Sequence, residues 1–512
     1  MPLLTDPAYH GLTAFFGDLH NHCNLSYGHG SLEDALYNAR LQLDFTSVTV
    51  HAVWHDIPRD DPELAYLIDY HDEGFTRAKA NWQDYLTTIN AHNYAGKFIT
   101  LPSFEWHSIK YGDYCVYYKI GDSASSVDAP ILDAPDLPAL RQMIRELKTP
   151  ALLIPHHIGY KQGSRGINWE TFSDELSSVV EIFSFHGLSE SSEGAYPYLH
   201  SMGPRHEHST AQYGWAQGHI FGVIGSTDHH NAFPGSYGYG RLGVWADSLS
   251  RESIWEAIKQ RRTYALTGDR IELAFALNNA PLGAITSANP ERYIEVDVLA
   301  GDSIDYIDVL HNNKIIHRES VLPQSADDSC YKVYMELGWA EQDNPYDWHV
   351  ALQVENGNLH HVEPRLRGNG PTEATSEDMD FAYTRLDYTG GNSLQLHTRT
   401  SQNKSLHTAS TEGLSLTIEG TAETRIIATI NNEQYALTLG DLLTGTRTFY
   451  TGGFVSPAIC FHRAIPRAEY HHHFAFTHIN QTSQRDWYYV RVRQRNNQWA
   501  WSSPIWVEGS SD

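Results

Sequence analysis

Residues 15–50 read FFGDLHNHCNLSYGHGSLEDALYNARLQLDFTSVTV. Residues 15–19 and 45–50 are short apolar runs and predict two buried strands. Between them, Ser31 is placed to cap a helix, with Asp34 three residues further on. The apolar residues that follow fall on one helical face, namely Leu32, Ala35, Leu36, Ala39 and Leu43. This stretch therefore predicts one β-α-β unit.

The alternation of apolar runs with helical stretches continues to about residue 265. Further buried strands are expected at 98–101, 151–154, 179–183 and 220–224, and helices near 75–92, 137–148 and 251–262. This rhythm is typical of β-α units repeated around a parallel sheet or barrel. We therefore expect an α/β barrel domain over residues 1–268.

The pattern changes after about residue 271. Runs such as YIEVDVL at 293–299 and WYYVRVR at 487–493 alternate with period two and are separated by turns rich in Asn, Gly and Asp. They predict an all-β, sandwich-like region over residues 269–512. The segment 364–412, rich in Gly, Thr, Ser and Asn, fits either a long loop or a set of short irregular strands. A chain of 512 residues is long enough for two such domains.

Composition and charge narrow the classes of partner. The chain has 41% hydrophobic and 19% charged residues, as soluble globular proteins do, and a formal net charge of −26. This charge disfavours nonspecific attraction to nucleic acid or anionic membranes, so we expect a small-molecule substrate, held by local positive charge if it is anionic. We see no leader-like pattern and no run of about 20 apolar residues, which predicts a cytoplasmic protein. The oligomeric state is left open.

Histidine is unusually frequent, with 30 residues, and imidazole is the commonest metal ligand. The four cysteines form no Cys-x-x-Cys pair, so no thiolate zinc site is indicated. Because the carboxyl ends of barrel strands converge, side chains that follow different strands are expected to meet. A lone histidine after a strand is more often a surface or satisfied residue, but eight candidates at six strand ends favour a cluster that binds Zn, Mn or Fe. The candidates are His20, His22, His51, Glu105, His156, His186, Asp228 and His230.

Four motifs in chain order carry a family resemblance: Gly17-Asp-Leu-His20-Asn-His22, Ser103-Phe-Glu105-Trp, Pro155-His156 and Gly225-Ser-Thr-Asp228-His-His230. They resemble the successive motifs of the PHP superfamily, named for polymerase and histidinol phosphatase. Three further stretches are similar to a poorly characterised PHP subfamily with a β-rich C-terminal region: Val180-Glu-Ile-Phe-Ser-Phe-His186-Gly, Arg262-Thr-Tyr-Ala-Leu-Thr-Gly-Asp-Arg270 and Trp501-Ser-Ser-Pro-Ile-Trp506. The resemblance covers nearly the whole chain.

The resemblance implies a distorted, TIM-like (β/α)7 barrel that holds two or three metal ions, often with phosphoesterase activity. It implies one ion held by His20, His22, Glu105 and Asp228. Glu105 would bridge to a second ion held by His156 and His186. A third ion would use His51, His230 and, from the loop after His22, His29. The family usually has Asp where this chain has Val50, which leaves the third ion open.

A centre of two or three cations suits hydrolysis, because one cation acidifies a water molecule and another holds a reacting oxygen. We expect Glu105, Asp228, His230 and His51 to be catalytic. The proton donor to the leaving group would be His51, His230, His157 or His229. Basic loop residues expected to bind an anionic substrate are Lys161, Arg165, Arg205 and Arg241. The run Tyr237-Gly-Tyr-Gly240 fits equally a flexible aromatic lip and an ordinary turn.

The favoured function is hydrolysis of a phosphoester of a small metabolite. The same chemistry also cleaves lactones, amides and carboxylic esters, so a hydrolase of a non-phosphate bond is the alternative. A second alternative is a binding protein without catalysis, in which the β half does the work. We expect that half to be structural or to shape the substrate site. Its run His471, His472 and His473 could reach a metal, although a solvated run is favoured.

Overall fold

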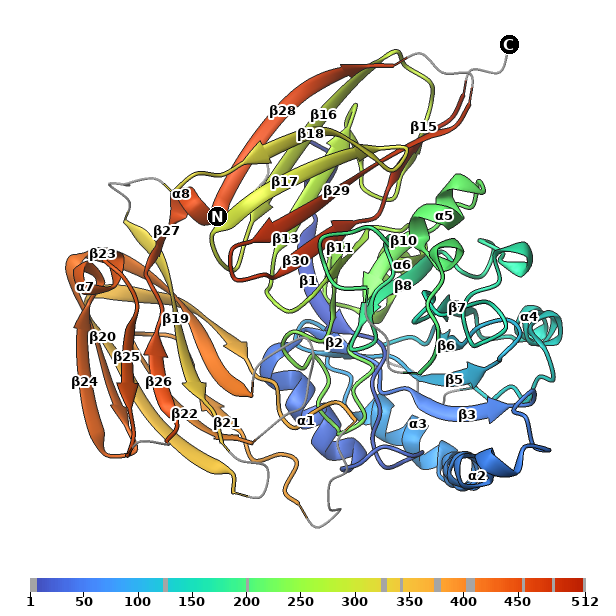
Figure 1. Cartoon of the computed structure of the whole chain (residues 1–512), viewed down its shortest axis with the longest axis horizontal. Coiled ribbons are helices and arrows are strands. Elements are labelled where there is room, and N and C mark those ends of the chain that lie inside the picture. Colours follow the sequence, from blue (N-terminus) through green and yellow to red (C-terminus); the bar gives the residue numbers. More distant parts are fainter. Residues whose placement is uncertain are drawn as a thin grey trace.

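The structure of the protein is a computed structural model that describes residues 7–122, 128–198, 202–323, 329–340, 344–372, 379–401, 410–453, 456–480 and 484–509. Figure 1 shows three parts: the N-terminal half in blue to green, and two β units whose strands run from yellow-green to red. The fold is mixed α/β and rich in strands. Among the described residues, no helix is long and apolar enough to cross a membrane.

The N-terminal half contains most of the helices and twelve of the described strands. Its helices are α1 (Leu32–Gln42), α2 (Ala65–Ala80), α3 (Trp82–Ala91), α4 (Leu137–Glu146), α5 (Ala211–Ala216) and α6 (Arg251–Lys259). Its strands are β1 (Thr13–Asp18), β2 (Phe45–Thr46), β3 (Val50–Trp54), β4 (Ile99–Thr100), β5 (Ser103–His107), β6 (Tyr114–Tyr118), β7 (Ala151–Pro155), β8 (Val179–Ser184), β9 (Gly187–Leu188), β10 (Gly222–Gly225), β11 (Arg241–Ala246) and β12 (Thr263–Leu266).

The expected first unit is confirmed, with one change. Ser31 caps α1 and forms a capping box with Asp34, because each residue bonds the other's backbone amide. The strand expected at 45–50 is two strands, β2 and β3, separated by a short extended segment. The helix expected near 75–92 is likewise divided, into α2 and α3.

Hydrogen bonding divides these strands among three sheets. β4, β2, β1, β11 and β12 are neighbours in one sheet, β3, β5, β6 and β7 in a second, and β10, β8 and β9 in a third. β1 pairs antiparallel with β11, and β6 pairs antiparallel with both β5 and β7. The strand pairing therefore does not show a regular (β/α)7 barrel. Antiparallel neighbours can be joined by a short loop, as β5 and β6 are, so some strands have no helix between them.

Part of the first β unit continues the large sheet of the N-terminal half, and four of its strands form a separate sheet. Its strands are β13 (Glu272–Leu277), β14 (Ala280–Pro281), β15 (Ile285–Thr286), β16 (Glu291–Leu299), β17 (Ile304–His311), β18 (Lys314–Ser320), β28 (His471–Ile479), β29 (Asp486–Gln494), β30 (Trp499–Ser502) and β31 (Ile505–Val507). β30 pairs antiparallel with β12, where Trp501 lies opposite Ala265. The division after residue 268 stays a prediction, and a continuous sheet crosses it.

The second β unit is a large antiparallel sheet with its own apolar core (Figure 1). Its elements are β19 (Cys330–Gly338), β20 (Tyr346–Arg365), β21 (Arg385–Asp387), β22 (Ser393–Thr400), β23 (Thr411–Ile430), β24 (Glu433–Thr438), α7 (Leu439–Leu443), β25 (Arg447–Tyr450), β26 (Ala458–Phe461), β27 (Ile465–Pro466) and α8 (Arg467–Tyr470). The two longest strands, β20 and β23, pair with each other. The C-terminal half is rich in strands, as predicted, and also contains two short helices, α7 and α8.

The segment 364–412, for which the sequence left two readings, combines both. It contains the strands β21 and β22 and, before them, a buried loop of residues 366–371, which we call the strap. Residues 373–378 and 402–409 lie outside the described residues. The strap leaves the end of β20 and packs against residues 229–237 of the N-terminal half.

Replacing Ser31 with Ala should loosen the start of α1, because the variant loses the acceptor for the Asp34 amide. We expect a loss of about 1 kcal/mol in local stability. Hydrogen exchange of the Asp34 amide should then be about fivefold faster. The control variant, Ser31→Thr, keeps a capping hydroxyl and should exchange like the wild type. Equal rates in the Ala variant would contradict the capping role.

Candidate metal centre

Side chains from all three sheets of the N-terminal half meet at one buried point. His51 lies within β3 and Glu105 within β5, while the other candidates follow strand ends. His20 and His22 follow β1, His156 follows β7, His186 lies between β8 and β9, and Asp228 and His230 follow β10. The exposed fraction of these side chains is 5% or less, except for His230, at 19%.

Backbone pairing brings the segment after β1 to the segment after β10. The Asp228 amide donates to the His20 carbonyl at 2.7 Å, and the His22 amide donates to the His229 carbonyl at 2.7 Å. Asp228 itself has a φ of +56°, in the left-handed region that non-glycine residues rarely adopt. The two motifs that were predicted to share ligands are therefore held together by their main chains.

The Glu105 carboxylate lies between two groups of imidazoles. Its Oε2 is 3.2 Å from His51 Nε2, 3.5 Å from His22 Nε2 and 3.6 Å from His20 Nε2. Its Oε1 is 3.1 Å from His156 Nε2 and 3.2 Å from His107 Nδ1. Burial acts to raise the pKa of Glu105, but contacts with imidazoles, first His107 and His51, hold it well below its usual range. One carboxylate thus contacts ligand candidates on both sides.

Asp228 contacts a second set of imidazoles. Its Oδ1 is 3.0 Å from His22 Nε2 and 3.2 Å from His20 Nε2, and its Oδ2 is 3.0 Å from His186 Nε2. The His230 ring packs 4.4 Å from the His22 ring, centre to centre, and its Nδ1 lies 2.8 Å from the Asp228 carbonyl. The structure therefore brings together the eight ligand candidates of the sequence.

The donor atoms fit metal ions better than they fit one another. His20 Nε2, His156 Nε2 and Glu105 Oε2 are buried without a hydrogen-bond partner, although other donor atoms lie within 3.6 Å. Such atoms are close but not aligned for hydrogen bonds, as expected when they face a common point. Several groups of side chains have donor atoms that all lie within 4.8 Å of one another. Three of these groups are His20, His22 and Asp228; His22, His51 and His230; and His20, Glu105, Cys115 and His156. Imidazole and carboxylate donors suit Zn, Mn or Fe.

Cys115 is a neighbour of the centre that the sequence did not indicate. It lies on β6, directly opposite Glu105 on β5. Burial raises the pKa of its thiol to about 12. The group therefore stays a neutral thiol at physiological pH unless a metal displaces its proton.

The second ring nitrogen of each of four ligand candidates has its own partner. His20 Nδ1 is 3.0 Å from Glu181 Oε2, and His22 Nδ1 is 2.7 Å from the Thr49 carbonyl. In the same way, His51 Nδ1 bonds Ser26 Oγ at 2.9 Å and His186 Nδ1 bonds the Tyr160 hydroxyl at 2.7 Å. Such partners fix the ring orientation and leave Nε2 facing the centre. Glu181 had a signal in the sequence, as a carboxylate inside an apolar strand.

A second network, also missed, surrounds the fully buried Asp113. Its Oδ2 accepts a hydrogen bond from Arg165 Nε at 2.7 Å and lies 3.3 Å from His107 Nδ1 and 3.4 Å from His157 Nε2. Burial acts to raise the pKa of Asp113, but the Arg165 guanidinium and His107 hold it well below its usual range. Arg165 Nη2 is 3.1 Å from His107 Nδ1. The predicted substrate residue Arg165 thus lies beside the centre, with 19% of its side chain exposed.

Arg205 and Lys161, two other basic candidates, have different surroundings. Arg205 donates to the Leu188 carbonyl at 2.6 Å and stacks 3.9 Å from the Tyr198 ring centre. Lys161 is exposed and lines a separate cavity of about 950 Å³ together with Lys110. Their roles in substrate binding stay predictions.

The prediction for Arg241 is corrected. Its side chain is fully buried, with Nε 2.9 Å from the Gly235 carbonyl and Nη2 2.8 Å from Gln42 Oε1. A guanidinium enclosed in this way holds loops together and does not meet a substrate. The run Tyr237 to Gly240 is an ordinary packed turn, because Tyr237 is buried and its hydroxyl donates to Asp269 at 2.7 Å.

The loop after His22 approaches His51 with residues other than His29. Tyr27 stacks on the His51 ring at 3.6 Å, while the His29 amide donates to the His230 carbonyl at 2.8 Å. A ligand role for the His29 ring stays a prediction. Val50 is buried within β3, so no carboxylate is present at that position of the strand.

The two additional proton-donor candidates differ. His229 uses both ring nitrogens, since Nδ1 accepts from the Asn231 amide at 3.1 Å and Nε2 lies 2.9 Å from the Asn369 carbonyl. His157 is buried with its Nδ1 unpartnered, and its ring centre is 4.2 Å from that of His156. Burial, with help from His156, holds the pKa of His157 well below its usual range. His157 therefore keeps a free nitrogen beside the centre, and His229 does not.

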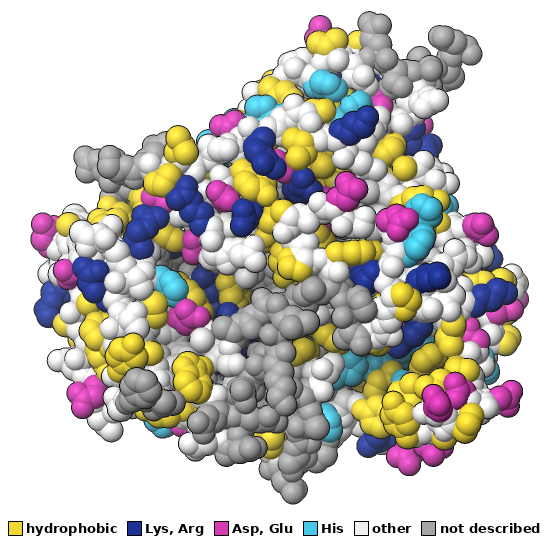
Figure 2. Space-filling model, in the orientation of Figure 1, with side chains coloured by type: hydrophobic (Ala, Val, Ile, Leu, Met, Phe, Trp, Pro, Cys, Tyr) yellow, Lys and Arg dark blue, Asp and Glu magenta, His cyan; other side chains and the backbone are white. Residues whose placement is uncertain are grey.

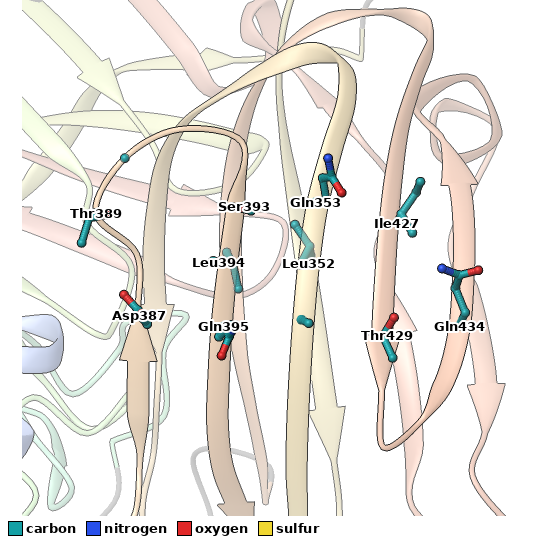
Figure 3. A pocket seen from close by; sticks show the side chains of 12 residues that line it. Leu352, Gln353, Asp387, Thr389, Ser393, Leu394, Gln395, Ile427, Thr429 and Gln434 are labelled. Atoms are coloured by element: carbon teal, nitrogen blue, oxygen red, sulfur yellow. The ribbon is translucent and has the colours of Figure 1, made fainter.

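The C-terminal histidine run stays within its own β unit. His471, His472 and His473 lie on β28 and pair with carboxylates of that unit at 2.8 to 3.2 Å. A further cavity, of about 390 Å³, lies on the second β unit. Figure 3 shows side chains that line it. The labelled side chains that line it, such as Gln353, Gln395 and Gln434, are mostly neutral, and none is a ligand candidate.

Comparisons with known sequences give partial matches. A family model described as "Protein of unknown function (DUF3604)" matches residues 235–281. An uncharacterized protein of Chlamydia trachomatis is 30% identical over 169 residues, which cover 30% of this chain and 27% of that protein. One of Chlamydia pneumoniae is 23% identical over 276 residues, covering 51% and 44% respectively. The chain spans less than half the length of these curated relatives.

Two solved structures show remote likeness. One is a two-domain protein of Bacteroides vulgatus containing a predicted PHP-like metal-dependent phosphoesterase, with 12% identity, a TM-score of 0.30 and coverage of 85% of this chain and 98% of that one. The other is PsfC of Pseudomonas syringae, with 15% identity, a TM-score of 0.28 and coverage of 45% and 82%. At these scores, neither likeness carries an argument about this chain.

Replacing Glu105 with Gln should remove metal from the centre, because the neutral amide keeps the shape but loses the charge shared by both imidazole groups. Elemental analysis of the purified variant should show at least one ion fewer per chain than the wild type. Glu295→Gln is the matched control, since Glu295 contacts His473 on the first β unit. Full metal content in the Glu105 variant would contradict the bridging role.

Proposed function

We propose that this protein is a metal-dependent hydrolase of the PHP type that cleaves a phosphoester of a small metabolite. The observation that carries the proposal is the Glu105 carboxylate, whose two oxygens contact separate groups of imidazoles with unpartnered nitrogen atoms. A carboxylate in this position is suited to bridge two cations. Centres of two or more cations are characteristic of enzymes that displace groups at phosphorus.

Three groups of residues would hold the ions. They are His20, His22 and Asp228 with Glu105; His156 and His186 with Glu105; and His51 and His230. When bound, such ions acidify a water molecule and polarise the phosphoryl oxygens. Val50 supplies no carboxylate to the third group.

The remaining residues position a substrate and handle protons. His230 and Arg165 are partly exposed side chains beside the centre, so a substrate could reach the ions near them. Arg165 carries a positive charge, fixed by Asp113, that can orient an anionic oxygen. Burial holds the pKa of His157 low, so its unpartnered Nδ1 can accept a hydrogen bond or a proton beside the centre.

Charge favours a small substrate over a polymer. The chain has a net charge of −26, so a nucleic acid would be repelled by the surface as a whole, whereas a small ester would respond mainly to the centre. On the face shown in Figure 2, Lys and Arg side chains are interspersed with Asp and Glu and form no continuous basic area.

A panel of phosphate mono- and diesters, tested with added Zn, Mn or Fe, should show metal-dependent phosphate release by the wild type. Glu105→Gln should fall to background, because its centre is incomplete, while Glu295→Gln should match the wild type.

Hydrolysis of lactones, amides or carboxylic esters without phosphate release would overturn the phosphoesterase assignment. The protein would then still be a metal-dependent hydrolase. Metal binding without turnover on any of these classes would favour a binding protein.

A further inference from the structure

The strap of the second β unit lies against the segment that carries Asp228 and His230. The His230 amide donates to the Pro371 carbonyl at 2.8 Å. On either side of His230, the His229 ring bonds the Asn369 carbonyl at 2.9 Å, and the Asn231 side-chain amide donates to the Gly370 carbonyl. Three successive residues of the centre's loop are therefore bonded to three residues of the strap.

The strap is fastened to the second β unit by Glu412, at the start of β23. One oxygen of the Glu412 carboxylate accepts the Arg367 amide at 2.8 Å, and the other accepts the Gly368 amide at 2.8 Å. The Arg367 side chain donates to the Thr411 hydroxyl at 2.6 Å. Glu412 is buried, so water cannot take its place as the hydrogen-bond acceptor for these two amides.

Close approaches leave the strap little freedom. Gly368 has a φ of +68°, and a Cβ at this position would lie 2.5 Å from the Phe233 ring. Asn38 of α1 donates to both the Ala232 and the Phe381 carbonyls, each at 2.9 Å, and so joins the loop to the chain beyond the strap. The contact is thus packed and bonded on both sides.

We propose that the second β unit is a positioning device for the metal centre, in which the strap fixes the backbone at His230 and Glu412 is the positioning residue. The inference rests on the metal centre of the proposed function, but not on the bond that is cleaved. The His230 amide is the connecting group, because it donates directly to Pro371 of the strap. Loss of this acceptor would remove one of the bonds that hold the residue beside His22 and Asp228. Removing such outer support typically weakens metal affinity by about 10- to 100-fold.

The test compares Glu412→Ala with Glu419→Ala, a control on the same strand whose side chain is 48% exposed and pairs with His360. Zinc is added back to the metal-free proteins, and the dissociation constants are measured by competition with a chromophoric chelator. We expect the weakest zinc ion of Glu412→Ala to bind at least about tenfold less tightly, and Glu419→Ala to match the wild type. Glu412→Gln keeps one acceptor oxygen and should be intermediate.

Hydrogen exchange of the amides at residues 229–231 is the second readout, which needs neither zinc nor substrate. These amides should exchange faster in Glu412→Ala and unchanged in Glu419→Ala. Faster exchange with unchanged zinc affinity would overturn the positioning role, and unchanged exchange would overturn Glu412 as the anchor. If Glu412→Ala does not fold, Ser236→Ala replaces it, because it removes the 2.6 Å hydrogen bond to the Arg367 carbonyl, and the same outcomes apply. Absence of zinc binding in the wild type would refute the metal centre itself, while exchange would still test the strap.

Discussion

The Glu105 carboxylate, buried among imidazoles, is the constraint on which the rest of the centre depends. A buried charge without compensation costs several kcal/mol, so it must be paired with cations or with protonated groups. One observation favours cations: several donor atoms around Glu105 lack hydrogen-bond partners. Burial lowers the pKa of His156 to about 4. For His20, burial acts to lower the pKa, but Asp228 holds it well above its usual range, so protonation of His20 offsets part of the buried charge.

The scaffold meets this constraint by bringing strand ends from separate sheets to one point. Partners such as Glu181, Ser26 and Tyr160 then orient the rings from behind. The second β unit adds a further layer, because its strap bonds the backbone beside His230. Residues more than 130 positions apart, such as His230 and Pro371, are therefore parts of the same centre.

The sequence predicted what depends on local patterns. The capping box at Ser31 was confirmed because a cap and its helix are neighbours in sequence, and the eight ligand candidates meet because each follows or lies in a strand. The sheet pairing was not predictable from the same patterns. β11 pairs antiparallel with β1, and β6 pairs antiparallel with β5, where a regular barrel would have parallel neighbours. The prediction that Arg241 binds substrate was wrong, because the sequence around an arginine near a ligand motif does not show whether its side chain faces a cavity or the core. The strap depends on contacts across the chain, for which a single sequence holds no signal.

Anomalous X-ray diffraction of crystals grown with zinc, recorded above and below the zinc absorption edge, tests whether Glu105 bridges metal ions. We expect two anomalous peaks, one within coordination distance of each Glu105 oxygen, with His20 and His22 around one ion and His156 around the other. Peaks confined to other parts of the molecule, or a Glu105 carboxylate bonded only to protein groups, would contradict this expectation.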